Sequence, residues 1–347
     1  MTGLQAVAWA IADDMARRLP KQRKTQREKH ATLTAAVLSE RTVNLMELGH
    51  ALPIQSANPA TRYQWIKRTL ANDLIVPAEV LAPYARQVLE KVSTNGRQPI
   101  VIIDQSQATK LHRHEMLMVA VRVGGRALPL AWCVRKTAGA IGFSEQRRLL
   151  QIVAGWLPDG VRPVLMGDRF YGSPDLITWC ADNGWDWRLR LKGGLLVHDR
   201  DGGETTVMES FERGERRLID VTLTEKRAAT HVAMIHEPGH PEPWLIAMSQ
   251  PPTSYRALDY GLRWGIEALF SDTKTRGFNL GDSHLRRADR IERLILILAL
   301  ALYWAVSTGM WDAVNNPSAA EKKPPNTARA DTPAPCSPSS SEASAAS

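Results

Sequence analysis

The stretch Tyr255–Arg276 reads YRALDYGLRWGIEALFSDTKTR and predicts a helix of about six turns. It carries Tyr260, Arg263, Glu267 and Lys274. At about 100° of rotation per residue, these four side chains lie within roughly 60° of one another on one helix face. Two cations that flank a carboxylate suit a phosphate and a metal cation held side by side. The alternative interpretation is a solvated face with an ordinary Arg263–Glu267 pair one turn apart.

The spacing of the four residues resembles a known signature. Tyrosine, two residues, arginine, three residues, glutamate, six residues and lysine is the Y-R-E-K pattern of DDE transposases encoded by bacterial insertion sequences, in the insertion-sequence-four group. The resemblance implies an RNase H-like core with Glu267 as the third catalytic carboxylate. It also implies two aspartates upstream, one on the first strand and one just after the fourth.

Two aspartates follow apolar runs at suitable places. Asp104 ends the run PIVIID, whose β-branched residues predict a strand buried on both faces. Asp168 follows the short apolar run RPVLMG. The alternative for Asp104 is a cap on the next turn.

The elements between and after these aspartates follow the RNase H-like order. Strands are expected at 115–123 and 126–135 around the turn Gly124-Gly125, then a helix at 144–157 and a strand at 162–167. A helix begins at Ser173-Pro174, and an alternating strand covers 186–192. The expected fold class is α/β (α+β), with a mixed RNase H-like sheet and flanking helices.

Short strands and turns from 193 to 252 predict an all-β insertion, which is typical of the resembling group. Its Trp244 lies in an apolar strand, so burial is favoured over stacking on a DNA base. The predicted domains are an N-terminal helical DNA-binding domain (1–95), the first part of the core (96–192), the insertion (193–252), the second part of the core (253–312) and a disordered tail (313–347).

Basic residues are concentrated near the N-terminus, in the run Arg17–Lys29 (RRLPKQRKTQREK). This run suggests a solvated or flexible arm, which in a DNA-binding protein neutralises phosphates. Helices are expected at 42–52 and 61–72, and the second is basic and aromatic, as in a helix-turn-helix-like unit. Any small helical bundle gives a similar pattern.

Charge and composition favour an intracellular protein that binds nucleic acid. The net charge of the 347 residues is +8, which favours a polyanionic partner. The three cysteines are far apart and form no Cys-x-x-Cys pair, which argues against a disulfide framework and against a cysteine zinc site. No secretion signal is evident. The apolar stretch Leu294–Trp311 just reaches the length of a membrane span, but a buried core helix is favoured.

The resemblance also implies the chemistry. Asp104, Asp168 and Glu267 are the expected catalytic and metal-binding residues, and they hold two Mg²⁺ (or Mn²⁺) ions for phosphoryl transfer. Arg263 and Lys274 are expected to hold a phosphate, and Tyr260 to contact the backbone near the transposon end. Two further arginines on one strand face are expected DNA contacts, with a solvated face as the alternative: Arg188 and Arg190.

The predicted function is a transposase that cleaves the ends of its own insertion sequence and joins the 3′ ends to target DNA, by a cut-and-paste route. The expected partners are transposon-end and target DNA and a second copy of the chain in the synaptic complex, with no membrane. The expected location is the cytoplasm, with the nucleoid. Two alternatives stay open: a catalytically inactive end-binding relative that inhibits transposition, and a small membrane-anchored basic protein.

Overall fold

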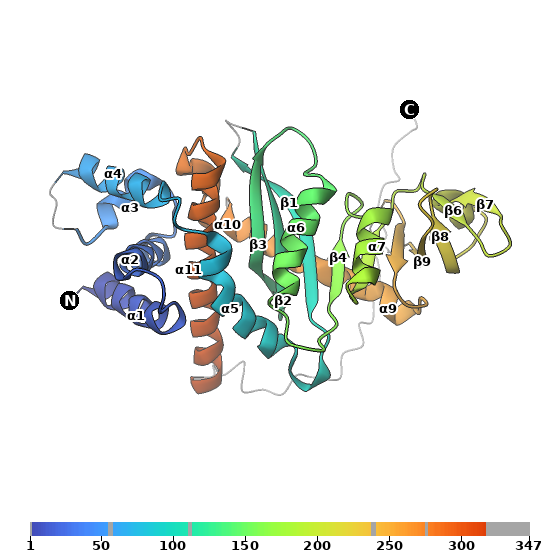
Figure 1. Ribbon diagram of the computed structural model, residues 1–347, viewed down its shortest axis with the longest axis horizontal. Helices are drawn as coiled ribbons and strands as arrows, with labels where there is room; N and C mark the ends of the chain where they lie inside the picture. Colours follow the sequence, from blue (N-terminus) through green and yellow to red (C-terminus); the bar gives the residue numbers. More distant parts are fainter. Residues whose placement is uncertain (1, 55–57, 110–112, 237–240, 275–276, 317–347) are drawn as a thin grey trace, which may run out of the picture. The chain divides into compact units, whose positions relative to one another are not determined.

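The computed structural model describes residues 2–54, 58–109, 113–236, 241–274 and 277–316 (Figure 1). The chain divides into two compact units, Met1–Trp304 and Ala305–Ser347. The candidate site lies wholly in the first unit. The expected disordered tail falls mostly on residues 317–347, outside the described residues.

One mixed sheet organises the first unit, in the order β3-β2-β1-β4-β5-β10-β9-β8-β6-β7. Its first half has β1 antiparallel to β2 and parallel to β4, and β4 parallel to β5. This mixed α/β arrangement is consistent with the expected RNase H-like fold. The strands are β1 (Ile100–Thr109), β2 (His114–Val123), β3 (Arg126–Lys136), β4 (Val164–Gly167) and β5 (Asp186–Arg190).

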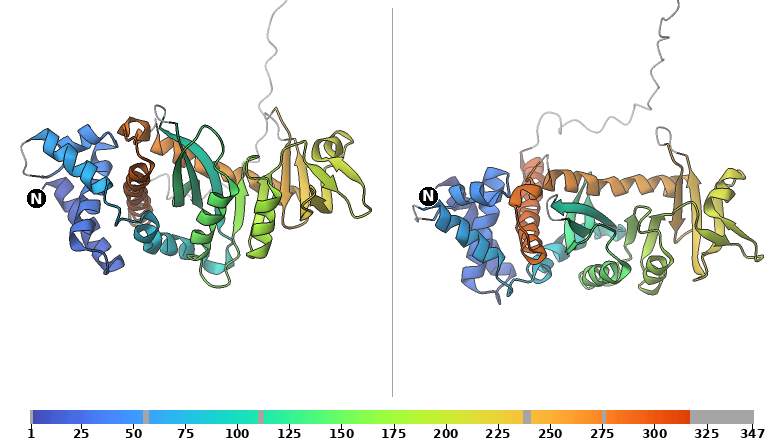
Figure 2. Two further views of the ribbon diagram at one scale, coloured as in Figure 1. Left: turned by 45° about the horizontal axis from the view of Figure 1, so that its top comes forward. Right: turned by 90° about the horizontal axis from the view of Figure 1, so that it is seen from above.

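The local signals around these strands are confirmed. The β2–β3 hairpin turns at Gly124, whose φ of +59° is easily reached only without a side chain. Helix α6 (Phe143–Ala154) precedes β4, and helix α7 (Pro174–Asp182) begins where the Ser173 hydroxyl accepts a hydrogen bond from Leu176 N. Both helices cover one face of the sheet (Figure 2).

The predicted insertion continues the same sheet, because β10 pairs with β5 along an antiparallel ladder. Its strands are β6 (Leu196–His198), β7 (Glu204–Thr206), β8 (Arg217–Leu223), β9 (Ala228–Ile235) and β10 (Trp244–Met248). The expectation of an all-β insertion was wrong at α8 (Val207–Glu212). There Thr206 and Glu209 form a capping box, which starts a helix in place of a strand.

The stretch that begins at Ser254 is not one continuous α-helix. It consists of α9 (Ser254–Leu258), the 3₁₀ segment η2 (Asp259–Trp264) and α10 (Gly265–Thr273), which run along the other face of the sheet (Figure 2). A 3₁₀ turn advances the side chains by about 120° per residue, so the simple helical wheel does not hold here. At Gly265 an added Cβ would lie 3.3 Å from the Arg126 carbonyl oxygen, so glycine permits α10 to approach β3 closely.

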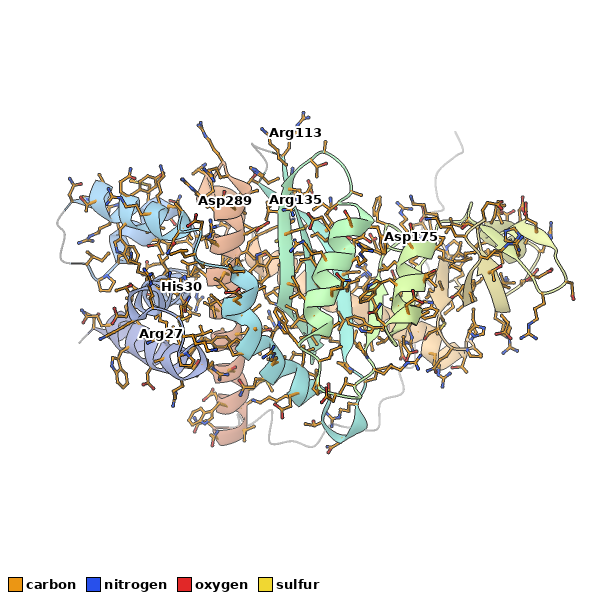
Figure 3. The ribbon with its side chains drawn as sticks, viewed as in Figure 1. Arg27, His30, Arg113, Arg135, Asp175 and Asp289 are labelled. Atoms are coloured by element: carbon orange, nitrogen blue, oxygen red, sulfur yellow. The ribbon has the colours of Figure 1, made fainter. Side chains whose placement is uncertain are left out.

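The N-terminal region is helical, as expected, with α1 (Gly3–Arg18), α2 (Lys24–Glu40), α3 (Leu45–Ala51), α4 (Pro59–Leu70), α5 (Pro77–Val92) and η1 (Thr94–Gly96). The prediction of a flexible arm at Arg17–Lys29 was wrong. This run forms the end of α1, a short turn and the start of α2. The Arg27 guanidinium donates to the carbonyls of Leu19 and Gln22 and so fastens the turn (Figure 3).

Helix α11 (Ala288–Asn315), which follows the short η3 (Leu280–Ser283), contains the apolar stretch of membrane-spanning length. It is long and apolar enough to cross a membrane, but 56% of its most apolar 18-residue window is buried inside the protein. Its side chains from Leu294 to Tyr303 are all buried, and the Tyr303 hydroxyl donates to the Pro129 carbonyl. Arg135 of β3 pairs with both Glu145 of α6 and Glu292 of α11 (Figure 3). This part of α11 is therefore a core helix.

Candidate active site

Asp104 and Asp168 lie at neighbouring strand positions. The parallel β1–β4 ladder ends with Ile103 opposite Gly167, so each aspartate is the next residue at the same edge. Strand β1 continues beyond Asp104, which pairs with Met118 of β2. The alternative of Asp104 as a turn cap is therefore wrong.

Arg263 joins two of the three predicted carboxylates. Its Nη1 lies 3.1 Å from Asp104 Oδ2 and its Nη2 lies 3.2 Å from Glu267 Oε1. The side chains of Arg263 and Asp104 are 11% and 15% exposed, whereas that of Glu267 is 59% exposed. Among the described residues, Arg263 Nε is buried without a hydrogen-bond partner. The guanidinium therefore has a donor left over for an incoming acceptor.

Negative charge is concentrated at this edge of the sheet. Burial raises the pKa of Asp104 to about 6; Arg263 opposes this shift, and the carboxylates of Asp168 and Glu267 add to it. Burial, followed by the charges of Asp104 and Asp168, also raises the pKa of Tyr171. A cation bound here would relieve this repulsion.

Tyr260 is buried, with 4% of its surface exposed. Its hydroxyl donates to the Gly167 carbonyl at 3.2 Å, and burial raises its pKa to about 12. Trp244 is 3% exposed and packs edge-on against the rings of Tyr260 and Trp264, so its predicted burial is confirmed. In this state Tyr260 supports the strand that ends at Asp168, and its DNA contact stays a prediction.

Lys274 follows the last residue of α10, and its ammonium donates to the Ser106 hydroxyl of β1. The Lys274 ammonium therefore contacts β1 two residues beyond Asp104. Asp272 of the same helix pairs with Arg126 instead, which supports the choice of Glu267 as the site carboxylate.

The two strand arginines are engaged within the protein. Arg188 Nε donates to the Arg256 carbonyl, and its guanidinium lies 3.7 Å from Asp259. Arg190 lies 3.3 Å from Glu242. Burial lowers the pKa of Arg188, whose side chain is only 12% exposed. The alternative of a fully solvated face therefore does not describe Arg188, and DNA binding by the pair remains a prediction.

Asp104 and Asp168 line one cavity of about 530 Å³. Its wall includes three residues that the sequence did not single out: Gln105, Glu115 and Tyr171. The Gln105 amide donates to Glu115 and to the Gly139 carbonyl. Adjacency in the sequence was the available signal for Gln105, since it follows the predicted Asp104, whereas strand alternation would put the two side chains on opposite faces.

The donor set fits a hard divalent cation, because carboxylate oxygens are the ligands that such ions prefer. In this structure the carboxylates of Asp104, Asp168 and Glu267 do not all come together at one point. Among the described residues, the cluster whose ligand atoms all lie within 4.8 Å of one another is His198, Glu204 and Glu225, elsewhere in the sheet. Glu267, being exposed and held by Arg263, must turn toward the aspartates to share an ion with them.

Two glycines let the loop after β4 pack closely against its surroundings. A Cβ on Gly167 would lie 2.8 Å from Tyr171 Cβ, and a Cβ on Gly172 would lie 2.1 Å from the Arg190 carbonyl oxygen. Both glycines flank Asp168 in the sequence GDRFYG. The loop after β4 therefore packs tightly only without side chains at these two positions.

A protein-family model matches part of the chain. Residues 144–304 match the family model described as the transposase DDE domain. The match includes Asp168, the strands of the insertion and the Glu267 helix, and it supports a DDE transposase. Such a transposase acts on DNA and uses a divalent metal. No curated protein matches the chain.

Proposed function

We propose that this protein is the transposase of a bacterial insertion sequence, of the insertion-sequence-four group with the Y-R-E-K signature. It cleaves the ends of its own element and joins the 3′ ends to target DNA. The observation that supports this most is the register of β1 and β4, which puts Asp104 and Asp168 side by side, with Glu267 tied to Asp104 through Arg263.

Asp104, Asp168 and Glu267 would hold the metal, as two Mg²⁺ or Mn²⁺ ions. When bound, the ions supply Lewis acidity and lower the pKa of an attacking water or 3′-hydroxyl. Asp104 lies within β1 and Asp168 directly follows β4, and these rigid elements fix the positions of their oxygens. Glu267 is exposed and contributes the movable third carboxylate.

Arg263 and Lys274 bind the phosphate backbone. The buried Nε of Arg263 has no partner among the described residues, and a phosphate oxygen would provide one. Tyr260 positions Asp168 through Gly167 and contacts the transposon end only after local rearrangement. Arg188 and Arg190 contact DNA after exchanging their pairs with Asp259 and Glu242.

The remaining assignments complete the proposal. Residues 1–95 recognise the ends of the element, and residues 96–192 and 253–312 form the catalytic core. Two copies of the chain act in the synaptic complex, by a cut-and-paste route. The protein works in the cytoplasm on DNA of the nucleoid.

The test is cleavage of a plasmid that carries the gene's own flanking DNA. Wild type, Glu267→Gln and Asp272→Asn would be compared with Mg²⁺ and with EDTA. Asp272 is the matched control, because it lies on the same helix but pairs with Arg126. Cutting at the flanks by wild type and Asp272→Asn, and only with metal, is expected.

Metal-dependent cleavage that survives in Glu267→Gln would contradict the assignment of the third carboxylate. End binding by wild type without any cutting, with either Mg²⁺ or Mn²⁺, would favour the alternative of an inactive end-binding relative that inhibits transposition.

A further inference from the structure

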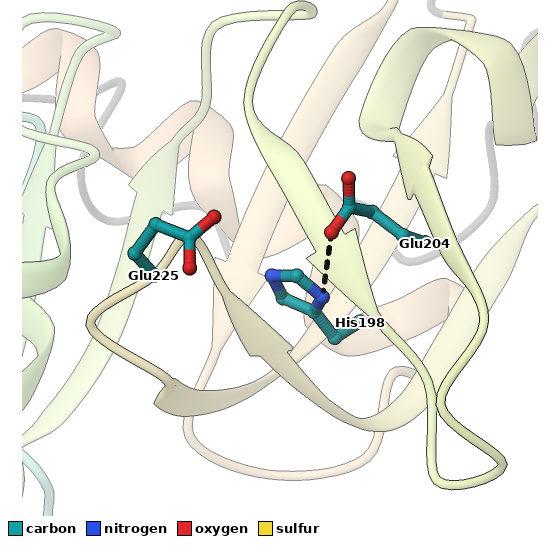
Figure 4. Close-up of side chains that lie close together, drawn as sticks. All are labelled: His198, Glu204 and Glu225. Carbon is teal, nitrogen blue, oxygen red and sulfur yellow. Dashed lines mark ion pairs between the residues drawn. The ribbon is translucent and has the colours of Figure 1, made fainter.

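A second group of metal-ligating side chains lies at the far edge of the sheet, away from the candidate active site. His198 ends β6, Glu204 begins β7, and Glu225 lies in the turn between β8 and β9 (Figure 4). One ligand atom from each comes within 4.8 Å of the other two. These residues are separated by 6 and 21 positions in the chain, so strand pairing alone brings them together.

The backbone fixes this arrangement. His198 pairs with Glu204 in the β6–β7 ladder and with Thr222 in the β6–β8 ladder. The Thr224 amide donates to the Leu196 carbonyl, which holds the start of the β8–β9 turn against β6. Lys226, next to Glu225, lies 2.5 Å from Asp175 of α7, which Figure 3 labels. The turn that carries Glu225 is therefore anchored on both sides.

His198 points to a ligand. The side chain is 3% exposed, and its Nε2 is buried without a hydrogen-bond partner among the described residues. Its Nδ1 lies 3.3 Å from Glu204 Oε2, and the other ring nitrogen faces Glu225 (Figure 4). A buried imidazole nitrogen without a partner is unfavourable unless something accepts or shares its lone pair.

The pairing of Nδ1 with Glu204 also favours the tautomer that ligates. When Nδ1–H donates a hydrogen bond to a carboxylate, the lone pair stays on Nε2, which is then the nitrogen that can bind a metal ion. Glu225 is exposed and can move its carboxylate toward Nε2 with little rearrangement. In the metal-free protein Glu204 holds the ring, and when the ion is bound one oxygen of Glu204 turns to it.

We propose that His198, Glu204 and Glu225 form a binding site for a divalent transition metal ion of the Zn²⁺ class. One imidazole nitrogen and two carboxylate oxygens match the ligands of Zn²⁺, whereas Mg²⁺ prefers oxygen alone. The ion joins β6, β7 and the β8–β9 turn. Strands β6 and β7 have three residues each, so their ladder is short and gains most from such a cross-link.

The test is Zn²⁺ binding to tag-free, full-length protein by isothermal titration calorimetry, in millimolar Mg²⁺ to occupy the site at Asp104 and Asp168. One Zn²⁺ per chain is expected for wild type. His198→Ala should abolish this binding, and Glu225→Gln should weaken it by about tenfold or more. Tetrahedral Co²⁺ absorption, seen in wild type and lost in His198→Ala, gives a second readout.

Two control variants lie in the same part of the sheet. His231 of β9 lies 3.5 Å from the Asp220 carboxylate, and Glu212 is exposed at the end of α8. His231→Ala and Glu212→Gln should both bind Zn²⁺ as wild type does. If His198→Ala unfolds this region, Glu225→Gln still decides the outcome, because Glu225 is exposed.

Three results would overturn the proposal: no Zn²⁺ uptake by wild type, equal affinity in Glu225→Gln, or equal affinity in a folded His198→Ala. Because DNA cleavage is not measured, failure here leaves the proposed transposase activity untouched.

Discussion

Replacing Asp104 by asparagine should stabilise the metal-free protein while removing its function. Asparagine resembles the protonated carboxyl group in shape and keeps an acceptor for Arg263. The wild-type carboxylate, in contrast, is buried beside Asp168 and Glu267, which raises its pKa to about 6. The folded protein therefore binds a proton at Asp104 more tightly than the unfolded chain, where the reference value is 3.8.

The sign and size follow from proton linkage. A raised carboxyl pKa favours the folded state fully below about pH 3.8, and this contribution is lost as the pH rises through about 6. The difference between the two pKa values corresponds to about 3 kcal/mol of unfolding free energy near pH 7.5, and to about 1.5 kcal/mol near pH 5. The side chain is only 15% exposed, so solvent screening reduces these values little.

Urea unfolding followed by circular dichroism, in EDTA, measures this effect. Asp104→Asn should exceed wild type by about 3 kcal/mol near pH 7.5, and the gain should shrink toward pH 5. Asp159→Asn, at an exposed turn, is the control and should change stability by less than about 0.5 kcal/mol at either pH. Mg²⁺ should raise the stability of wild type and leave that of Asp104→Asn nearly unchanged.

The reasoning would be refuted if Asp104→Asn were less stable than wild type near neutral pH in EDTA. A gain that did not depend on pH would be equally damaging, because it would come from packing and not from the buried charge.

Two further changes test the supports of the site. Tyr260→Phe removes the hydrogen bond to Gly167 and should lower the free energy of unfolding in urea by about 1 kcal/mol. If Tyr260 acts by positioning Asp168, cleavage falls while the affinity for the DNA end is kept. A loss of that affinity would instead indicate a direct DNA contact. Gly172→Ala puts a Cβ 2.1 Å from the Arg190 carbonyl oxygen and should destabilise by about 3 kcal/mol or more. Gly194→Ala, where nothing lies within 4 Å of the new Cβ, should be close to neutral in the same assay.

The sequence predicted those parts of the fold that depend on neighbouring residues. The hairpin at Gly124 and the helix start at Ser173 carry their own turn and cap chemistry. The same kind of signal was present and missed at Thr206 and Glu209, whose capping box makes a helix out of an apparently strand-like run.

Features that depend on residues far apart in the chain were harder to predict from the sequence. The wheel that grouped Tyr260 with Arg263 and Lys274 assumed an uninterrupted α-helix, whereas the 3₁₀ segment η2 turns Tyr260 into the core and leaves Arg263 at the carboxylates. The engagement of Arg188 by Asp259 depends on where the tertiary fold places η2, which no periodicity reveals. The cluster around His198 likewise exists only once β6, β7 and β8 are paired.

Arg263 explains how a site with three acidic groups stays folded without metal. Its guanidinium neutralises part of the charge by bridging Asp104 and Glu267, yet its own Nε is left buried and unpartnered among the described residues. Arginine cannot lose its charge at ordinary pH, so this arrangement is a compromise and not a fully satisfied ion pair. In the proposed function, metal ions take over the neutralisation of Asp104 and Glu267. The guanidinium is then free to donate to a phosphate oxygen at the edge of the sheet where the carboxylates lie, so that metal and DNA binding favour one another.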